Sequence, residues 1–376
     1  METAALILFL LALVGCGYNF AAAILVGRYE PGPAPELVTA PDVAILKPLH
    51  GSEPALAANL ASFLNQDYPG RVQLLCGIAD PGDPAAEAVA ALVAAPSRAS
   101  VTLVSDSGRH GSNAKVSNLI NLAARTSAPM IIVSDSDIAV APDYLRRIVA
   151  ALSAEGVGAV ICLYRGRGDA GLWSQLAAAG ISYQFMPAVA VGLATGRARP
   201  CMGSTIALRA VTLGRIGGFA RVADQLADDH ALGAAVRATG LSVVVPPMIV
   251  THGCNETSLA RVVRHEIRWN ATVRSLDPLG YVGSGITYPL PFALLGVALA
   301  GGQGWQVLVL AALARVTLKL RVDMVTGAAS APLWMLLPRD ILSLGTFLAG
   351  LFARSIDWRG ARLRMGRDGR LSAEGE

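Results

Sequence analysis

Two carboxylates one residue apart are the part of this sequence best suited to do chemistry. Asp135 and Asp137 closely follow the apolar run 130–133. A short continuous apolar run is typical of a strand buried on both faces of a parallel sheet, and an open α/β sheet binds its ligands at the carboxyl ends of such strands. Paired carboxylates at that place hold divalent cations, which most often partner phosphorylated substrates. The competing interpretation is a simple turn, because Asp and Ser are also favoured in turns.

A second group of residues stands on a predicted helix at 258–273. His265, Arg268 and Trp269 are separated by three and four residues, so they share one helical face. An arginine offers a two-pronged donor for phosphate, and a neighbouring tryptophan offers a flat apolar surface for a sugar or a lipid. For this helix taken alone, a structural salt bridge with an interfacial tryptophan is the alternative interpretation.

Strands and helices are predicted to alternate through the first half of the chain and to position these residues. Strands are expected at 43–49, 72–79, 101–104 and 130–133, and helices at 54–64, 85–94, 114–124 and 144–152. This rhythm implies a mostly parallel sheet with helices on both faces. Weaker strand signals follow at 160–163, 203–208 and 241–245. Asp80 ends the second strand, and the pair Asp228 and Asp229 falls in the less regular part.

The composition indicates a membrane protein with a large extramembrane part. Of the 376 residues, 53% are hydrophobic and 15% are charged, and the mean hydropathy is +0.49, which is too apolar for an ordinary soluble enzyme. No nucleic-acid motif or aromatic-interleaved basic stripe accompanies the net charge of +4, so we expect no nucleic-acid partner. The five cysteines are scattered and lack Cys-x-x-Cys spacing, which favours buried, reduced thiols over zinc ligands or disulfides.

Apolar segments at both ends of the chain predict how it is anchored. Residues 4–26 are long enough for a transmembrane helix, and a cleaved signal peptide is disfavoured because Met-Glu-Thr supplies no positive start. Further apolar runs cover 289–300, 305–313 and 331–353. An even number of spans is favoured, because it keeps the arginine-rich end on the cytoplasmic side. Arg339 and Asp340, inside the last run, are expected near a membrane face or against neighbouring helices.

These signals divide the chain into five parts. We expect an N-terminal transmembrane anchor at 1–28, a proline-rich linker at 29–42 and a cytoplasmic catalytic domain at 43–280. C-terminal membrane segments at 281–354 and a basic cytoplasmic tail at 355–376 complete the chain.

Taken in order, Asp80, Asp135-x-Asp137, Asp229 and Arg268-Trp269 resemble the motifs of the processive and lipid glycosyltransferases of the GT-A fold. The resemblance is closest to the ceramide glucosyltransferase family, glycosyltransferase family 21, which also holds bacterial hopanoid-biosynthesis glycosyltransferases. It covers nearly the whole chain, through segments 46–51, 67–69, 80–85, 113–119 and 358–360. It implies an α/β fold: a Rossmann-like GT-A domain with a mostly parallel sheet, and transmembrane helices at both ends.

The resemblance also implies a role for each matching residue. Asp80 is expected to contact the uridine of a UDP-sugar, and Asp135 with Asp137 to hold Mg²⁺ or Mn²⁺ on its diphosphate. Asp229 is the expected general base, and the like charge of Asp228 would raise its pKa. Further residues expected at the nucleotide, its diphosphate or the reacting groups are Lys47, Lys115, Arg268 and Trp269. His265 stands where the family usually has Gln or Arg. It can hydrogen-bond the diphosphate, but its charge depends on pH.

The implied activity is transfer of glucose or N-acetylglucosamine from a UDP-sugar to a lipid hydroxyl, with inversion of the anomeric centre. Ceramide and a hopanoid polyol are the two expected acceptors, at the cytoplasmic face of a bacterial inner membrane. One alternative is a processive polysaccharide synthase, although the chain has few apolar segments for a polymer channel. The other is an inactive, membrane-tethered module that binds a UDP-sugar or a lipid.

Overall fold

The computed structural model describes residues 2–94, 96–353, 356–358, 361–365 and 371–373, with side chains up to residue 353. The chain forms two compact units. The sheet unit comprises Pro31–Tyr164 and Arg199–Gly253, and the helical unit comprises Met1–Glu30, Arg165–Ala198 and Cys254–Glu376. Residues 165–198 and 254–280, which the sequence placed in a domain at 43–280, therefore belong to the helical unit.

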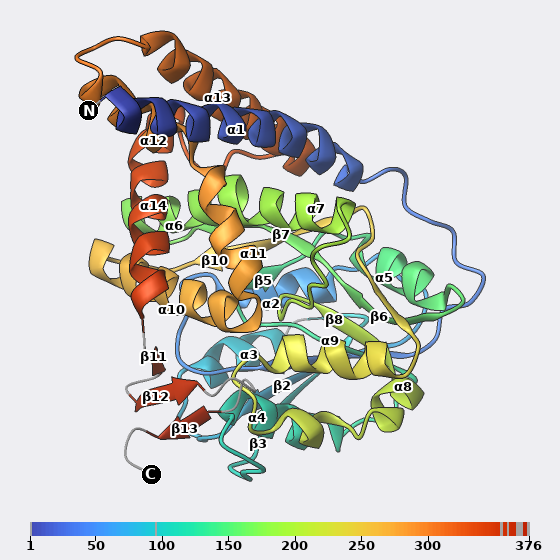
Figure 1. Ribbon diagram of the computed structural model, residues 1–376. Coiled ribbons are helices and arrows are strands. Elements are labelled where there is room, and N and C mark those ends of the chain that lie inside the picture. The colour runs from blue at the N-terminus through green and yellow to red at the C-terminus, as the bar shows by residue number, and fades with distance from the viewer. Residues whose placement is uncertain (1, 95, 354–355, 359–360, 366–370, 374–376) are drawn as a thin grey trace. The chain divides into compact units, whose positions relative to one another are not determined.

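A seven-stranded sheet in the order β3-β2-β1-β4-β8-β6-β9 forms the core of the sheet unit (Figure 1). Its strands are β1 (Val43–Pro48), β2 (Val72–Ile78), β3 (Ser100–Ser105), β4 (Met130–Val133), β6 (Val157–Ile161), β8 (Ile206–Arg209) and β9 (Ser242–Val244). Strands β3, β2, β1 and β4 are parallel, whereas β8 runs antiparallel to both β4 and β6. All four residues of β4 are buried, which explains its unbroken apolar sequence. The predicted α/β class with a mostly parallel sheet is confirmed.

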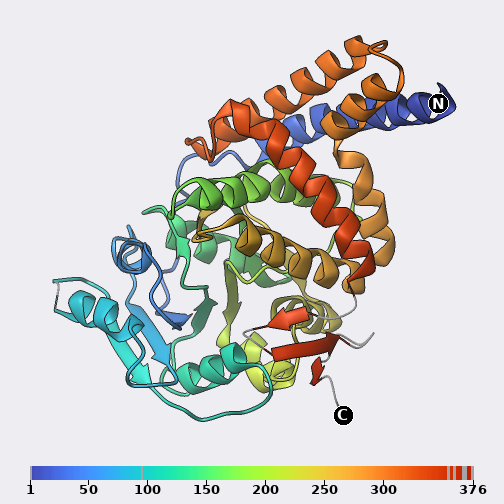
Figure 2. The same cartoon turned by 90° about the vertical axis from the view of Figure 1, so that its left-hand side faces the viewer.

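Helices cover this sheet much as the alternating pattern predicts. They are α2 (Leu56–Leu64), α3 (Ala85–Val93), α4 (Ala114–Ala123), α5 (Tyr144–Ser153), α8 (Ala210–Arg215) and α9 (Asp228–Ala238). Helices α3 and α4, cyan and teal in Figure 2, pack on the parallel half of the sheet. The Asn113 side chain caps α4 by accepting hydrogen bonds from the backbone N–H groups of Lys115 and Val116. A short antiparallel pair, β5 (Ile138–Ala139) with β10 (Ile249–Cys254), was not predicted.

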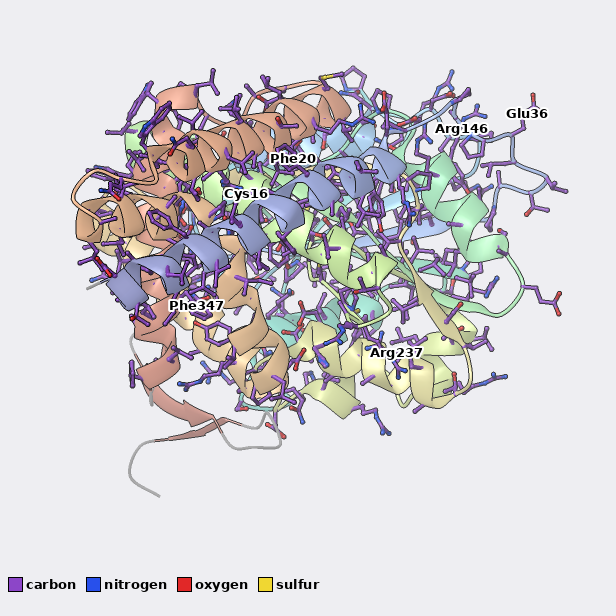
Figure 3. The ribbon with its side chains drawn as sticks, turned by 45° about the horizontal axis from the view of Figure 1, so that its top comes forward. Cys16, Phe20, Glu36, Arg146, Arg237 and Phe347 are labelled. Atoms are coloured by element: carbon purple, nitrogen blue, oxygen red, sulfur yellow. The ribbon has the colours of Figure 1, made fainter. Side chains whose placement is uncertain are left out.

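The helical unit is built from α1 (Glu2–Val26), α6 (Leu172–Gly180), α7 (Met186–Ala194), α10 (Leu259–Leu276), α11 (Pro278–Gly283), α12 (Pro289–Leu299), α13 (Trp305–Thr326) and α14 (Leu336–Phe352). A π-helical turn, Ile181–Phe185, joins α6 to α7. Helix α1 packs against α12 and α13 through small residues, among them Ala12, Cys16 and Ala293. Figure 3 shows Cys16 and Phe20 on α1; Cys16 is buried, whereas Phe20 is 36% exposed.

Three helical segments in the described residues are long and apolar enough to cross a membrane: Glu2–Tyr29, Leu172–Ala194 and Leu333–Phe352. A fourth candidate is a pair bent by 60°, Pro278–Thr287 with Pro289–Leu299. The sequence pattern indicated the first and last of these but not Leu172–Ala194. The predicted apolar run 305–313 is only the first half of α13, whose second half carries several charges.

Arg315 and Asp340 form a buried ion pair inside the helical unit. Arg315 on α13 and Asp340 on α14 form two hydrogen bonds of 2.7 Å, and both side chains are 1% exposed. Arg315 also donates to Asn19 Oδ1 on α1 and to the backbone carbonyl of Tyr183, both at 2.9 Å. Asp340 therefore faces neighbouring helices, one of the two placements expected from the sequence.

All five cysteines are buried and free, as predicted. At the C-terminal end, short antiparallel strands β11 (Ile356–Trp358), β12 (Ala361–Met365) and β13 (Leu371–Ala373) pair in order. The side chains of the predicted basic tail at 355–376 lie outside the described residues.

Candidate active site

The two aspartates that opened the sequence analysis lie on the loop between β4 and β5. Asp135 Oδ1 is 2.6 Å from Lys115 Nζ, and Asp137 Oδ2 is 3.2 Å from His252 Nε2 on β10. Asp137 Oδ1 is buried without a hydrogen-bond partner among the described residues. Burial raises the pKa of Asp137, and the nearby His252 opposes that shift. The loop thus presents two carboxylates, one of which has an unsatisfied oxygen.

The first turns of α4 and α9 bring further charge to these carboxylates. Lys115 Nζ, next to Asp135, is also 3.8 Å from Asp228 Oδ2. The Asn113 amide donates to Asp228 Oδ1 at 3.3 Å and to the Gln225 carbonyl at 2.9 Å, which ties the starts of the two helices together. Although burial opposes the charge of Lys115, the surrounding carboxylates raise its pKa overall. Lys115 is therefore a permanent cation between Asp135 and Asp228.

Asp229 is held by backbone donors. Its Oδ2 accepts the N–H of Gly203 at 3.0 Å, and its Oδ1 accepts the N–H of His230 at 2.7 Å. Burial raises the pKa of Asp229, against the effects of Lys115 and of these hydrogen bonds. Burial likewise raises the pKa of the adjacent Asp228 to about 6, although Lys115 opposes this shift. A fixed carboxylate with a raised pKa has the properties of a general base near neutral pH.

Gly203 is a site residue that sequence reasoning missed. A Cβ atom at this position would lie 3.0 Å from Asp135 Oδ2, 3.1 Å from Lys115 Nζ and 3.7 Å from Asp229 Oδ2. The glycine backbone thus lies among the three charged groups and leaves open a space that a side chain would fill. The sequence showed only a glycine at the start of a predicted strand, and β8 in fact begins at Ile206.

Lys47, predicted to contact the diphosphate or nucleotide, is completely buried beneath the Asp135–Asp137 loop. Its ammonium group donates to the Asp135 carbonyl at 2.7 Å and to Ser134 Oγ at 3.1 Å. The Phe63 ring covers the same group, with its centroid 3.7 Å from Nζ. Burial lowers the pKa of Lys47 to about 7, against the nearby carboxylates. In this geometry the lysine contacts the loop backbone, and its contact with the diphosphate or nucleotide stays a prediction.

Asp80 lies on the loop that follows β2, two strands away from Asp135 in the sheet. Its side chain is exposed, and Oδ1 accepts the N–H of Gly82 at 2.9 Å. The neighbouring Asp83, to which the sequence analysis gave no role, is buried and accepts the N–H groups of Gly51 and Ala85, each at 2.9 Å to Oδ1. Asp83 therefore ties the loops after β1 and β2 together, and Asp80 stands on an ordered turn.

The remaining predicted residues belong to the helical unit, on α10. His265 Nδ1 is 2.6 Å from Glu256 Oε1, and the His265 and Trp269 rings meet edge to face with centroids 4.6 Å apart. The Trp269 ring also packs against Phe185 of the π-helical turn, at 6.1 Å between centroids. The predicted helix is present, and His265 and Trp269 do share a face of it.

Glu266, between these residues in sequence, fixes the rotation of α10. Arg339 of α14 binds it through two hydrogen bonds of 2.5 and 2.6 Å, and Thr346 donates to it at 3.0 Å. Because Arg268 is two residues further along the helix, it points about 200° away from Glu266. The sequence gave Glu266 no role, since only the fold reveals that a buried arginine faces it.

The Asp135–Asp137 loop fits a divalent cation. Glu53 Oε1 accepts the hydroxyl of Ser136 at 2.7 Å, while Glu53 Oε2, like Asp137 Oδ1, is buried without a partner among the described residues. Buried carboxylate oxygens with unused lone pairs are suitable ligands for Mg²⁺ or Mn²⁺. No group of three or more His, Cys, Asp or Glu side chains in the described part forms a complete metal site, so substrate and water oxygens would complete the coordination.

Known proteins that are similar to this chain include a glucosyltransferase and two glycosyltransferases of known structure. Ceramide glucosyltransferase 1 of Caenorhabditis elegans is 29% identical over 116 residues, which is 31% of this chain and 24% of that protein. The mannosyltransferase PcManGT from Pyrobaculum calidifontis, solved in complex with GDP-Man and Mn²⁺, has a TM-score of 0.52 at 19% identity, covering 92% of this chain and 97% of that one. GalNAc-T7 with UDP, GalNAc and Mn²⁺ has a TM-score of 0.43 at 11% identity, covering 65% and 52%, a similarity too low to carry an argument.

The similarity to the mannosyltransferase shows a shared glycosyltransferase fold. The chain spans about a quarter of the length of the ceramide glucosyltransferase that it matches. The family model for glycosyl transferase family 21 matches residues 7–371. Because that match covers nearly the whole sequence, as the motif order predicted, this chain belongs to glycosyl transferase family 21.

Proposed function

We propose that this glycosyltransferase moves a hexose from a UDP-sugar to a hydroxyl group of a membrane lipid, with inversion of the anomeric centre. The observation that carries the proposal is the arrangement of Asp135, Lys115 and Asp229 around the open backbone of Gly203. It combines a cation-binding loop, a fixed positive charge and a candidate base within one site.

The donor's diphosphate is the group that this charge pattern suits. Asp135 and Asp137 would hold Mg²⁺ or Mn²⁺, which when bound supplies neutralising positive charge for a departing diphosphate. Lys115 adds a second positive charge, and it stands at the start of α4, where the helix dipole also favours an anion. Asp80, exposed on its turn, is proposed to contact the uridine.

Asp229 is the proposed base for the acceptor. As the lipid hydroxyl oxygen bonds to the anomeric carbon, its proton passes to a carboxylate oxygen of Asp229, and the bond from that carbon to the diphosphate breaks. The raised pKa of Asp229 matches this task, because a carboxylate of ordinary acidity is a weak base near neutral pH. A single displacement of this kind converts a UDP-α-sugar into a β-glycoside, and an α-linked product would contradict it.

The helical unit supports a membrane-lipid acceptor. Three of its helical segments are long and apolar enough to cross a bilayer, and the Arg268–Trp269 pair stands on α10 of this unit. By family resemblance, Arg268, Trp269 and His265 are proposed to take part in holding donor and acceptor. We further propose ceramide or a hopanoid polyol as acceptor, UDP-glucose or UDP-N-acetylglucosamine as donor, and a bacterial inner membrane with its catalytic domain in the cytoplasm.

A matrix of donors and acceptors tests this proposal. Radiolabelled UDP-glucose and UDP-N-acetylglucosamine are each offered to ceramide and to bacteriohopanetetrol in detergent, with Mn²⁺ or Mg²⁺. We expect a labelled glycolipid from at least one pair with the native chain and none with Asp229→Asn. A folded protein that binds a UDP-sugar yet forms no product with any pair would contradict the proposal and favour a binding module.

A further inference from the structure

The loop that carries the two aspartates rests on a buried lysine. Lys47 is the fifth residue of β1, the strand next to β4, and its side chain has no exposed surface. The four-carbon stem takes the ammonium group beneath the loop, where the Phe63 ring replaces water as its cover at 3.7 Å. A buried ammonium group is costly unless hydrogen bonds satisfy it.

Those hydrogen bonds go to both ends of the loop. At its start Lys47 donates to the Asp135 carbonyl at 2.7 Å and to Ser134 Oγ at 3.1 Å. At its end the Ile138 carbonyl lies 3.5 Å from the same nitrogen. One side chain from the neighbouring strand therefore spans the whole turn that presents Asp135 and Asp137.

The same contacts continue to the segment that contains Gly203. The Ser134 hydroxyl, which accepts from Lys47, donates to the carbonyl of Ser204 at 2.9 Å. Ser204 in turn donates its hydroxyl to the carbonyl of Cys162 at 3.3 Å, at the end of β6. Lys47 is thus linked through Ser134 to Ser204. Its neighbour Gly203 donates its backbone N–H to Asp229.

We infer that Lys47 is a positioning residue, which fixes the Asp135–Asp137 loop in the conformation that binds the cation. The effect of Lys47 on cation binding rests on the proposed function, whereas its contacts with the loop do not. A purely electrostatic role would have the opposite sign: a positive charge beneath the loop repels a bound cation, so its removal should tighten cation binding. Loss of a residue that orients the ligands should weaken it.

Replacement by methionine separates the two roles. In Lys47→Met the stem is preserved, but the carbonyls of Asp135 and Ile138 lose their donor. We expect the Kd for Mn²⁺, measured by electron paramagnetic resonance well below the Tm, to rise by about tenfold or more, as is usual when a group that supports a metal ligand is lost. Amide hydrogen exchange of residues 134–139 should accelerate in the metal-free protein.

Arg209→Met is the matched control. Arg209 is also a cation that donates to backbone carbonyls, those of Val157 at 2.8 Å and of Leu152, but it stands at the other end of β8. This variant should lower the Tm while leaving Mn²⁺ affinity and exchange of residues 134–139 unchanged. A similar change in both variants would mean that Lys47 contributes only general stability, which overturns the inference.

Two further outcomes keep the inference separate from the proposed function. Tighter Mn²⁺ binding by Lys47→Met, or unchanged loop exchange, would contradict positioning even if the native chain is fully active. If the native chain binds no Mn²⁺ even in the presence of UDP, the proposed function fails, but faster exchange confined to Lys47→Met would still support positioning of the loop. Should Lys47→Met not fold, Ser134→Ala removes one acceptor of the ammonium group. This variant must also accelerate the exchange of residues 134–139, by a smaller factor.

Discussion

Two groups of charged side chains, one in each unit of this chain, are paired to different extents. In the helical unit, Arg315 and Asp340 are 1% exposed and meet through two hydrogen bonds, with further acceptors for the arginine. In the sheet unit, Lys115 and Asp135 remain 22% and 34% exposed, and buried carboxylate oxygens of Glu53 and Asp137 have no partner in the described chain. The first set of charged groups is complete in its hydrogen bonding, whereas the second set is incomplete because it contains buried oxygens without a partner.

This difference separates a structural role from a functional one. A buried charge is tolerated when its partners satisfy it fully, and removal of one partner then costs stability. A buried carboxylate oxygen without a partner has lost its hydrogen bonds to water and has gained none from the chain. Such groups are retained where a ligand supplies the missing interaction, so completeness of pairing predicts which charges govern stability and which govern activity.

The largest effect should follow from Asp229→Asn, which lies beside the incomplete set. Loss of a general base should lower kcat by about 10²- to 10⁴-fold. The Kd of the UDP-sugar should stay within about twofold. The Tm should change little, because asparagine removes the buried charge but can accept only one of the two backbone N–H groups. Single-turnover kinetics and isothermal titration calorimetry measure the two constants. Loss of donor binding together with turnover would assign Asp229 to the donor site.

Asp340→Asn tests the complete set. It leaves Arg315 as an uncompensated buried charge, so we expect a loss of about 3–5 kcal/mol of stability, or a fall in Tm of roughly 10 °C. A thermal-shift assay in detergent measures the fall in Tm, and the turnover of the folded fraction should be unchanged. The double variant Arg315→Leu with Asp340→Leu removes both charges and should recover much of the loss. A small effect of Asp340→Asn would contradict the comparison.

Gly203→Ala should act on binding more than on stability. Its Cβ would crowd Asp135 and Lys115. We therefore expect the Kd of the UDP-sugar to rise about tenfold, equivalent to about 1.4 kcal/mol. The matched control is Gly214→Ala on α8, where a Cβ meets nothing within 4 Å. That variant should bind the donor normally and should be slightly more stable. Equal donor affinity in both variants would remove Gly203 from the site.

The smallest effect is on pH dependence, and here activity and stability should move in opposite directions. Burial raises the pKa of Asp228 to about 6, so between about pH 4 and 6 the folded chain holds a proton that the unfolded chain has lost. The contribution of this group to stability therefore falls as the pH rises through that range, whereas kcat rises as Asp229 ionises. Asp228→Asn removes a like charge and should shift the acid limb of the kcat profile down by about one unit. An unchanged limb would mean that the pair does not control turnover.

The parallel half of the fold was predictable from the sequence, whereas much of the helical unit was not. Strand β4 was predicted at its observed bounds, because a strand buried on both faces is apolar at every position. The Leu172–Ala194 segment was missed because polar residues of the π-helical turn, Ser182 and Gln184 among them, interrupt its apolar pattern.

For the site, residue types were easier to predict than their partners. The carboxylates Asp135 and Asp229 could be picked out by charge and position along the chain. The contact of Lys47 with the loop backbone could not be predicted, since a lysine near the end of a strand offers the same sequence signal whether it faces a ligand or the core. Gly203 and Glu266 gave no signal, because their importance comes from atoms that the fold brings to them.

The burial of every cysteine has a practical consequence for locating this chain in a bilayer. Thiol-reactive reagents attack exposed thiolates, and burial raises the pKa of Cys76 and of Cys162 to about 12. The native chain should therefore react very little with an impermeant maleimide, so its own cysteines need not be removed first. A single cysteine introduced at Val38, in the exposed linker, or at Gln303, in the turn before α13, would then report which side of the membrane each position occupies.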